Sequence, residues 1–317
     1  MTLLTHMLPE TRRSQLRVRL DRGDNLRLIE AHSGLSAIVG CTSQLAGTDA
    51  GDIQFDGVWI SSLTSSASRG LPDMEMYILE RRLELIEEIA SVTSKVVIVD
   101  GDTGGEPSTL EYLCARLEAM GVCAVVVEDK QHPKRNSLSL DSSHVLEDPA
   151  VFSRKIARAK AALKSPDFLV FARLESLIAG ESPSDALQRA HMYLLAGADG
   201  IMIHSKSRNP DTIYEFLTGY QALCHELRVN RPVMCVPTTY NMVTAKELFD
   251  RGVRIVVHAN HLLRASHFAM RQVCETILRH DRTLEVDNIC TPVSEIFQTV
   301  GYNDALDRER QSTRVGP

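Results

Sequence analysis

Acidic side chains end two consecutive β-branched runs in this chain of 317 residues. Asp100 and Asp102 close the run KVVIVDGD, while Glu128 and Asp129 close the run CAVVVED. If these runs are parallel strands of one sheet, their carboxyl ends meet at one edge and the carboxylates lie close together. Carboxylates gathered in this way repel one another unless a cation neutralises them, and oxygen ligands are those that Mg²⁺ prefers. The pattern predicts a Mg²⁺ site, although each acid taken alone could instead cap the following helix.

A guanidinium and an imidazole follow in the next two β-branched runs. Arg173 lies in DFLVFARLES and His204 in DGIMIHS. The planar fork of Arg173 suits phosphoryl or carboxylate oxygens, and an ion pair with Glu175 is its alternative role. His204 alone could equally be a core histidine with satisfied hydrogen bonds. Together with the acids, the two side chains favour a binding site for a small anion.

A long polar segment follows Glu128 and reads DKQHPKRNSLSLDSSH. It lacks hydrophobic periodicity, and long loops in compact domains often serve as lids over a site. Lys130, Lys134 and Asn136 could then close over an anion. A solvated surface loop with ordinary charges is the alternative.

Eight short apolar runs alternate with longer amphipathic stretches along the chain. The runs lie at 26–32, 53–61, 95–102, 123–129, 167–176, 199–205, 232–238 and 254–259. Helices are predicted between them, for example at 74–91 and 109–121, where apolar residues recur at i, i+3 and i+4. Eight strand–helix units predict a closed (βα)8 barrel of the TIM type, whose active site lies at the carboxyl ends of the strands. A doubly wound open sheet is the alternative, but no GxGxxG follows the first strand.

Composition excludes several classes of protein. Hydrophobic residues make up 44% and charged residues 24%, as in ordinary globular domains, and the formal net charge of -6 gives no electrostatic reason to bind nucleic acid. No stretch of 18 apolar residues occurs, and the N-terminus lacks the apolar core of a signal peptide. None of the seven cysteines forms a CxxC pair, so we expect free thiols and no zinc site. We therefore expect a cytoplasmic protein without a membrane partner.

The chain divides into three expected parts. Residues 1–25 form an N-terminal arm, and 26–302 form the barrel catalytic domain together with a C-terminal helix. Residues 303–317 form a polar tail. No internal repeat or low-complexity linker indicates a further domain.

Seven segments resemble the phosphoenolpyruvate mutase family of the isocitrate lyase superfamily. They are GVWISSLTSSASRGLPD, VDGDTGG, VVVEDKQHPKRNSL, FARLES, MIHSK, VPTTY and HANHLLRAS. The similarity runs from about Arg27 to Phe297, and EDKxxxKxNS at 128–137 is its most specific motif. The resemblance implies the barrel fold, Mg²⁺ as cofactor, and a homotetramer or homodimer in which the C-terminal helix is exchanged between subunits.

The resemblance also implies a metal site. Asp100 would hold Mg²⁺ directly, and Asp73, Asp102 and Glu128 would reach it through water. The Mg²⁺ set that the resemblance implies thus contains three of the strand-end acids and adds Asp73.

The same resemblance implies contacts with a small-molecule substrate. These come from Ser61, Ser62 and Leu63, from Asn136 and Ser137, and from Arg173 and His204. The residues implied in catalysis are Asp73, Lys134, Asn136, Arg173 and His204. Lys134, Asn136 and Ser137 would belong to a gating loop in which Asn136 touches the phosphoryl group. Ser62 replaces the glycine of the family's SGL pattern.

The activity that the resemblance implies is the reversible conversion of phosphoenolpyruvate to 3-phosphonopyruvate, which begins phosphonate (C–P bond) biosynthesis. The alternative is a phosphonopyruvate hydrolase, but hydrolases of the family carry threonine where this chain has Asn136. The superfamily's lyases carry a cysteine in a KKCGH or KRCGH loop, and its absence here argues against cleavage of isocitrate or methylisocitrate. A non-catalytic barrel that binds phosphonates is a third hypothesis, but it would not need the full set of acids.

Overall fold

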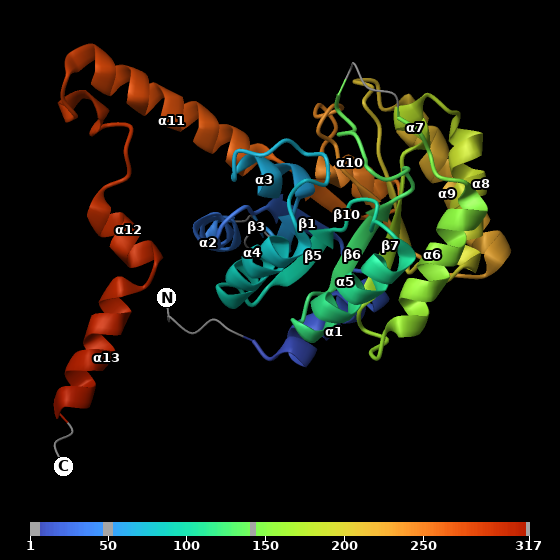
Figure 1. The fold of residues 1–317 in the computed structure, drawn as a ribbon, viewed down its shortest axis with the longest axis horizontal. Coiled ribbons are helices and arrows are strands. Elements are labelled where there is room, and N and C mark those ends of the chain that lie inside the picture. The colour runs from blue at the N-terminus through green and yellow to red at the C-terminus, as the bar shows by residue number, and fades with distance from the viewer. Residues whose placement is uncertain (1–6, 47–52, 140–143, 315–317) are drawn as a thin grey trace.

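The computed structural model describes residues 7–46, 53–139 and 144–314, and its centre is a closed barrel of parallel strands (Figure 1). The strands follow one another around the barrel in the order β1-β10-β9-β8-β7-β6-β5-β4. Their bounds are Leu26–Glu30 (β1), Gly57–Ile60 (β4), Val96–Asp100 (β5), Ala124–Glu128 (β6), Leu169–Leu174 (β7), Gly200–Ile203 (β8), Val233–Cys235 (β9) and Val253–His258 (β10). Seven of the predicted runs contain one of them, and the eighth, 254–259, covers β10 except for its first residue, Val253. The predicted barrel is thus confirmed, and the doubly wound alternative is wrong.

Helices surround the barrel and follow its strands in sequence (Figure 1). Their bounds are Gly34–Thr42 (α2), Ser62–Ala67 (α3), Leu79–Ser91 (α4), Pro107–Ala119 (α5), Pro149–Ala162 (α6), Ser176–Ala179 (α7), Pro183–Leu195 (α8), Asp211–Leu227 (α9) and Ala245–Asp250 (α10). Helix α1 (Pro9–Asp21) precedes the first strand, and its Leu16 packs with the side chains inside the barrel. A two-residue antiparallel pair, β2 (Gln44–Leu45) and β3 (Ile53–Gln54), lies outside the barrel.

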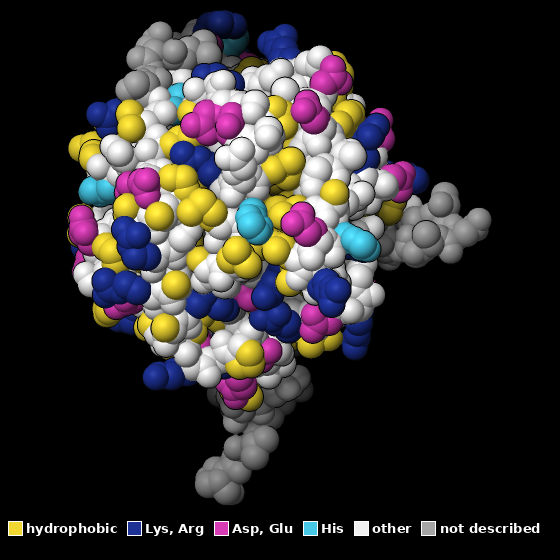
Figure 2. All heavy atoms as spheres, turned by 90° about the vertical axis from the view of Figure 1, so that its right-hand side faces the viewer, with side chains coloured by type: hydrophobic (Ala, Val, Ile, Leu, Met, Phe, Trp, Pro, Cys, Tyr) yellow, Lys and Arg dark blue, Asp and Glu magenta, His cyan; other side chains and the backbone are white. Residues whose placement is uncertain are grey.

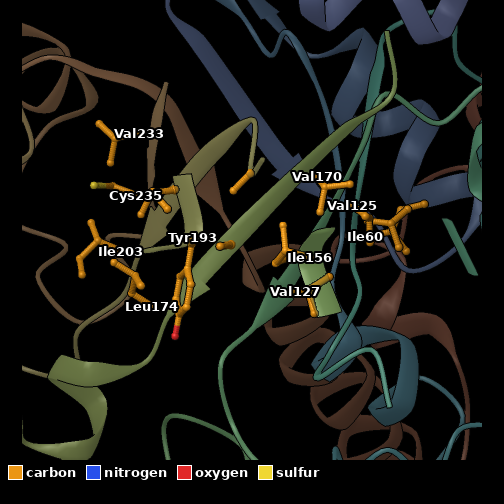
Figure 3. Close-up of a cluster of buried hydrophobic side chains, with 14 of the residues drawn as sticks. Ile60, Val125, Val127, Ile156, Val170, Leu174, Tyr193, Ile203, Val233 and Cys235 are labelled. Atoms are coloured by element: carbon orange, nitrogen blue, oxygen red, sulfur yellow. The ribbon is translucent and has the colours of Figure 1, made fainter. Parts of the chain in front are cut away.

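The apolar core has two parts because successive residues of a strand point to opposite faces. On β6, Ala124 and Val126 belong to the cluster inside the barrel, whereas Val125 and Val127 pack outward. The outward cluster includes Ile156 of α6 and other helix side chains, as Figure 3 shows. Strands buried on both faces are nearly continuous apolar runs, which is why the sequence revealed them.

One predicted helix begins later than expected. The apolar spacing predicted a helix over 74–91, but α4 begins at Leu79. Glu75 has a left-handed backbone with φ 57°, which no helical residue adopts. The pattern was wrong over these five residues because the Glu75 side chain is drawn into the site described below.

The C-terminal helices leave the barrel as a long arm (Figure 1). The arm contains α11 (His261–His280), the 3-10 turn Leu284–Val286, α12 (Val293–Thr299) and α13 (Tyr302–Arg314). No residue of α11 is buried, although large apolar side chains such as Phe268 and Leu278 lie along it. The segment 303–317, predicted as a polar tail, is helical over most of its length, because α13 extends to Arg314.

The surface of the barrel is of mixed charge where Figure 2 views it. Acidic and basic side chains are interspersed there with small apolar areas. That face offers no continuous basic surface of the kind that binds nucleic acid. None of the helices in the described ranges has the length and hydrophobicity needed to cross a bilayer.

Candidate active site

A small cavity lies at the carboxyl ends of the strands. Its volume is about 50 Å³. The predicted residues that line it are Ser61, Ser62, Leu63, Asp73, Asp100, Lys134, Asn136, Ser137, Arg173 and His204. Two predicted metal ligands, Asp102 and Glu128, lie behind this lining, where they pair with Lys134 and Arg173 respectively. The structure therefore brings every predicted site residue into one region.

Strand geometry positions the acids. Asp100 is the last residue of β5 and Glu128 the last of β6. Asp102 follows with a left-handed φ of 53°, which turns the chain sharply. Oδ1 of Asp100 accepts from the Asp102 amide at 3.1 Å, and its Oδ2 accepts from the Ser62 hydroxyl at 2.9 Å. These bonds hold Asp100 and Asp102 side by side.

The side chain of Lys134 extends from the loop and places its ammonium between the carboxylates of the site. Its Nζ lies 2.5 Å from Oδ1 of Asp102 and 3.2 Å from Oδ1 of Asp73, and donates to the Ser62 hydroxyl at 2.7 Å. Burial alone would lower the pKa of Lys134, but the surrounding carboxylates raise it well above its usual value. Burial acts to raise the pKa of Asp102, yet Lys134 and Arg82 together bring it well below its usual value. Lys134 is therefore an ammonium among carboxylates.

Glu128 lacks comparable compensation. Its side chain is 1% exposed, and neither carboxylate oxygen accepts a hydrogen bond from a described residue. The nearest cations are Nη1 of Arg173 at 3.5 Å and Nζ of Lys130 at 3.7 Å. Burial raises the pKa of Glu128 to about 7. A buried carboxylate without donors is suited to a further cation or to its bound water.

Arg173 makes the ion pair with Glu175 that was considered for it, and it also faces the cavity. It faces the cavity from β7, and its Nε donates to Oε1 of Glu175 at 2.5 Å. Its Nη2 lies 3.0 Å from Nδ1 of His204, and the same imidazole nitrogen lies 3.3 Å from Oε1 of Glu175. This nitrogen therefore faces both a donor and an acceptor. Burial and the nearby Arg173 lower the pKa of His204, so the ring is neutral.

The loop after β6 lies over the cavity. Nδ2 of Asn136 donates to Oδ2 of Asp73 at 2.6 Å, and Leu138 also lines the cavity. The amide of Lys134 donates to Oε2 of Glu75 at 2.9 Å. Positions 140–143 of the predicted lid lie outside the described residues. The described part is closed onto the site.

Two residues that the sequence did not single out support this arrangement. Arg82 donates to the Asp102 carboxylate and to the Asp100 carbonyl. The sequence could have indicated this role, because Arg82 is a charged residue on the side of α4 that is otherwise apolar and buried, next to Leu83. Glu75 accepts from the Thr103 hydroxyl as well as from the loop. Nothing in its sequence context distinguishes Glu75 from a surface acid.

The acids as they stand do not form a metal cage. Within the described residues, no group of three or more His, Cys, Asp or Glu side chains has the geometry to hold an ion. The Lys134 ammonium takes the central position among them. The oxygens of Glu128, which accept no hydrogen bond from a described residue, and the hard-oxygen donor set nevertheless fit Mg²⁺, which would compete with Lys134 for the acids that it contacts.

Comparison with known proteins identifies the relatives of this chain. The family model described as phosphoenolpyruvate phosphomutase matches residues 16–278. A crystal structure of phosphoenolpyruvate phosphomutase from Streptomyces platensis subsp. rosaceus is 36% identical, with a TM-score of 0.84 over 94% of this chain and 98% of that one. Phosphonopyruvate hydrolase from a Variovorax strain is also 36% identical, over 92% of this chain and 95% of its own. A structure of phosphonopyruvate hydrolase complexed with oxalate and Mg²⁺ is 34% identical, with a TM-score of 0.81 over 96% and 99% of the two chains.

Proposed function

This chain belongs to the phosphoenolpyruvate phosphomutase family, and on that basis we propose that it interconverts phosphoenolpyruvate and 3-phosphonopyruvate. The reaction is an isomerisation in which a phosphoryl group moves between oxygen and carbon of the same pyruvate unit. It makes a C–P bond, so the enzyme would begin the synthesis of a phosphonate. Because the enol phosphate is the more stable partner, a later enzyme must consume the phosphonopyruvate.

The closed loop is the observation that carries the proposal. An intramolecular transfer succeeds only if water is kept from the reactive phosphoryl group and the enolate. Asn136 and Leu138 line the cavity from the loop side, and Asn136 is bonded to Asp73 across it. A loop held in this way supports transfer to carbon over transfer to water.

The chain's own groups suit the two ends of the substrate. Arg173 offers a permanent cation for phosphoryl or carboxylate oxygens, and its position is fixed by Glu175. His204, as a neutral imidazole, would contact a substrate oxygen without adding charge. Phosphoryl transfer has a loose transition state, so positioning and charge stabilisation of this kind supply most of the rate.

We further infer a Mg²⁺ requirement. Asp100 would be the direct ligand, with Asp73, Asp102 and Glu128 acting through water. The donorless oxygens of Glu128 support this set, and the related hydrolase has been crystallised with Mg²⁺ and oxalate. Bound Mg²⁺ would stabilise negative charge on the enolate and phosphoryl oxygens. Lys134 would then give up its contacts with the acids and become available to the substrate.

Phosphonopyruvate hydrolase is the second candidate. The Variovorax hydrolase is as similar in sequence as the Streptomyces mutase structure, so overall identity does not separate the two activities. They differ in whether water reaches the phosphoryl group, which makes Asn136 the deciding position. Its amide favours the mutase.

The arm supports an assembly of identical chains. A helix of 20 residues with apolar side chains and no buried residue needs a partner surface. We propose that α11–α13 are exchanged with a second copy in a homodimer or homotetramer. We also place the enzyme in the cytoplasm, because all its described cysteines are free thiols, which suits a reducing compartment.

A coupled assay tests the activity. Phosphonopyruvate and Mg²⁺ are supplied with lactate dehydrogenase and NADH, which report pyruvate directly. Addition of pyruvate kinase and ADP then reports phosphoenolpyruvate. The proposal predicts NADH oxidation only after the second addition. Oxidation before it indicates the hydrolase, and none at either stage indicates a barrel that binds without turnover.

A further inference from the structure

A buried ion pair lies beneath the loop, between Lys130 and the Glu175 carboxylate that also holds Arg173. Nζ of Lys130 is 2.8 Å from Oε2 of Glu175, and the two side chains are 2% and 0% exposed. Burying two charges costs desolvation, and apolar residues of similar volume often stabilise a protein as well or better. Lys130 and Glu175 therefore call for an explanation other than stability.

The remaining donors of Lys130 go to the loop. Its ammonium donates to the carbonyl of Arg135 at 3.0 Å and to the hydroxyl of Ser137 at 2.6 Å. The ammonium thus has one ion-pair partner just after β7 and two hydrogen-bond acceptors in the loop. Because Lys130 lies at the root of the loop, it binds the segment 135–137 back against the barrel.

Glu175 links the same segment to the anion anchor. Its Oε2 accepts from the Ser137 hydroxyl at 2.6 Å, and its Oε1 accepts from Nε of Arg173 at 2.5 Å. The Ser137 oxygen also accepts from Nη2 of Arg173 at 2.8 Å. Ser137 thus donates once and accepts twice, so its hydrogen-bonding capacity is filled.

We propose that Lys130 and Glu175 are positioning residues that form a latch, which couples closure of the loop to the orientation of Arg173. With the loop closed, Ser137 completes the shell around the guanidinium. With the loop open, Lys130 and Arg173 each lose that hydroxyl. The binding of substrate by Arg173 and the exclusion of water are then one event. The chemical consequence rests on the proposed function, but the latch itself does not.

Limited proteolysis tests the latch without reference to activity. Trypsin can cut after Lys134 only when the loop opens, because that side chain is 3% exposed. Lys130→Met keeps the length of the side chain and removes its three donors, so cleavage after Lys134 should accelerate by about tenfold, as expected for loss of a charged hydrogen bond. Lys246→Met is the matched control, because Lys246 lies exposed on α10 in a surface pair with Asp250. The loop of this variant should be cleaved at the same rate as the loop of the wild type.

A double variant separates the latch from general stability. Lys130→Met leaves Glu175 as a buried, less compensated charge and should lower the unfolding temperature. Adding Glu175→Gln removes that charge and should restore much of the stability, while cleavage after Lys134 stays fast. If the loop of the double variant is as resistant as that of the wild type, or if Lys130→Met alone cleaves at the wild-type rate, the latch does not exist.

Activity gives the second measurement. With phosphonopyruvate and Mg²⁺, Lys130→Met should lose more in kcat than it changes in KM, and its products should contain a larger share of phosphate than those of the wild type. An unchanged kcat and product ratio would overturn the coupling to Arg173 even if the loop cleaves faster. A wild type that makes only phosphate contradicts the proposed mutase and leaves the proteolysis result valid for the latch.

Discussion

At the scale of single residues, the acids differ in what already satisfies them. Asp100 holds Ser62 and the Asp102 amide, and Asp102 is paired with Lys134. Glu128 has no hydrogen-bond partner among the described residues. Glu128 thus has only the more distant cations of Arg173 and Lys130, at 3.5 and 3.7 Å, whereas a metal ion would have to displace Lys134 from Asp102.

Removal of Asp100 should abolish the response to Mg²⁺. Asp100→Ala takes away the proposed direct ligand, and we expect turnover of phosphonopyruvate to fall by at least about 100-fold at saturating Mg²⁺. Circular dichroism should remain that of a folded barrel. Asp250→Ala, which removes an exposed carboxylate, serves as the control. Near-normal turnover by Asp100→Ala would show that the metal assignment is wrong.

His204 should make stability depend on pH in metal-free protein. Burial and Arg173 lower its folded-state pKa below 6.5, so the unfolded chain takes up a proton that the folded protein does not. The contribution of neutral His204 is present above pH 6.5 and is lost as the pH falls through the folded-state pKa. Between about pH 7.5 and about pH 5, the unfolding free energy should fall more steeply for the wild type than for His204→Gln. Equal slopes in urea titrations would contradict this.

Sequence patterns located the residues that carry the chemistry better than those that support them. Arg173 and Asp100 stand at strand ends, where the barrel predicts a site. Glu75 and Arg82 come from a segment before α4 and from α4 itself, and they reach the site through tertiary contacts. Such contacts depend on side chains far apart in sequence, which no local period records.

At the scale of elements, we expect the loop after β6 to control whether water or carbon receives the phosphoryl group. Asn136 is its predicted contact with the substrate, and in this structure its amide is bonded to Asp73. That bond explains how the loop can be closed before substrate arrives. It also means that Asn136 must give up its hydrogen bond to Asp73 before its amide can donate to a substrate oxygen.

Asn136→Ala should therefore lower mutase activity by at least about tenfold and shift the remaining turnover toward pyruvate and phosphate. Alanine removes the donor and leaves room for water beside the phosphoryl group. The coupled assay gives the ratio of the two products, with Asn209→Ala on an exposed loop as the control. An unchanged rate and ratio would show that Asn136 is not the gate.

At the scale of the whole molecule, the residue pattern predicted the barrel, whereas the exchange of the C-terminal helix was implied only by the family resemblance. Strands buried on both faces leave a continuous apolar record, so their number and order could be inferred. The apolar period of α11 predicts a helix with a covered face. It does not say whether that face lies on its own barrel or on another copy of the chain, and in one chain no part of α11 is buried.

Charge on the apolar face of α11 should break the assembly. We expect the wild type to exceed 35.2 kDa, the mass of one chain, in light scattering, as a homodimer or homotetramer. Phe268→Asp combined with Leu278→Asp should shift it toward the single-chain mass, because both side chains are more than half exposed in the lone chain and would be buried by a partner. A wild type that is already a single chain would contradict the exchange.

The central claim is that the phosphoryl group moves within one molecule and never meets water. It is tested most directly by ³¹P NMR of phosphonopyruvate incubated with the wild-type enzyme and Mg²⁺ in ¹⁸O-labelled water. A mutase converts the phosphonate signal into that of phosphoenolpyruvate, with no ¹⁸O in the three non-bridging oxygens on its phosphorus, because these come from the phosphonate group of the substrate; only the bridging oxygen, which was the exchangeable keto oxygen, can carry label. Inorganic phosphate that carries ¹⁸O as the main product would contradict the mutase and identify a hydrolase.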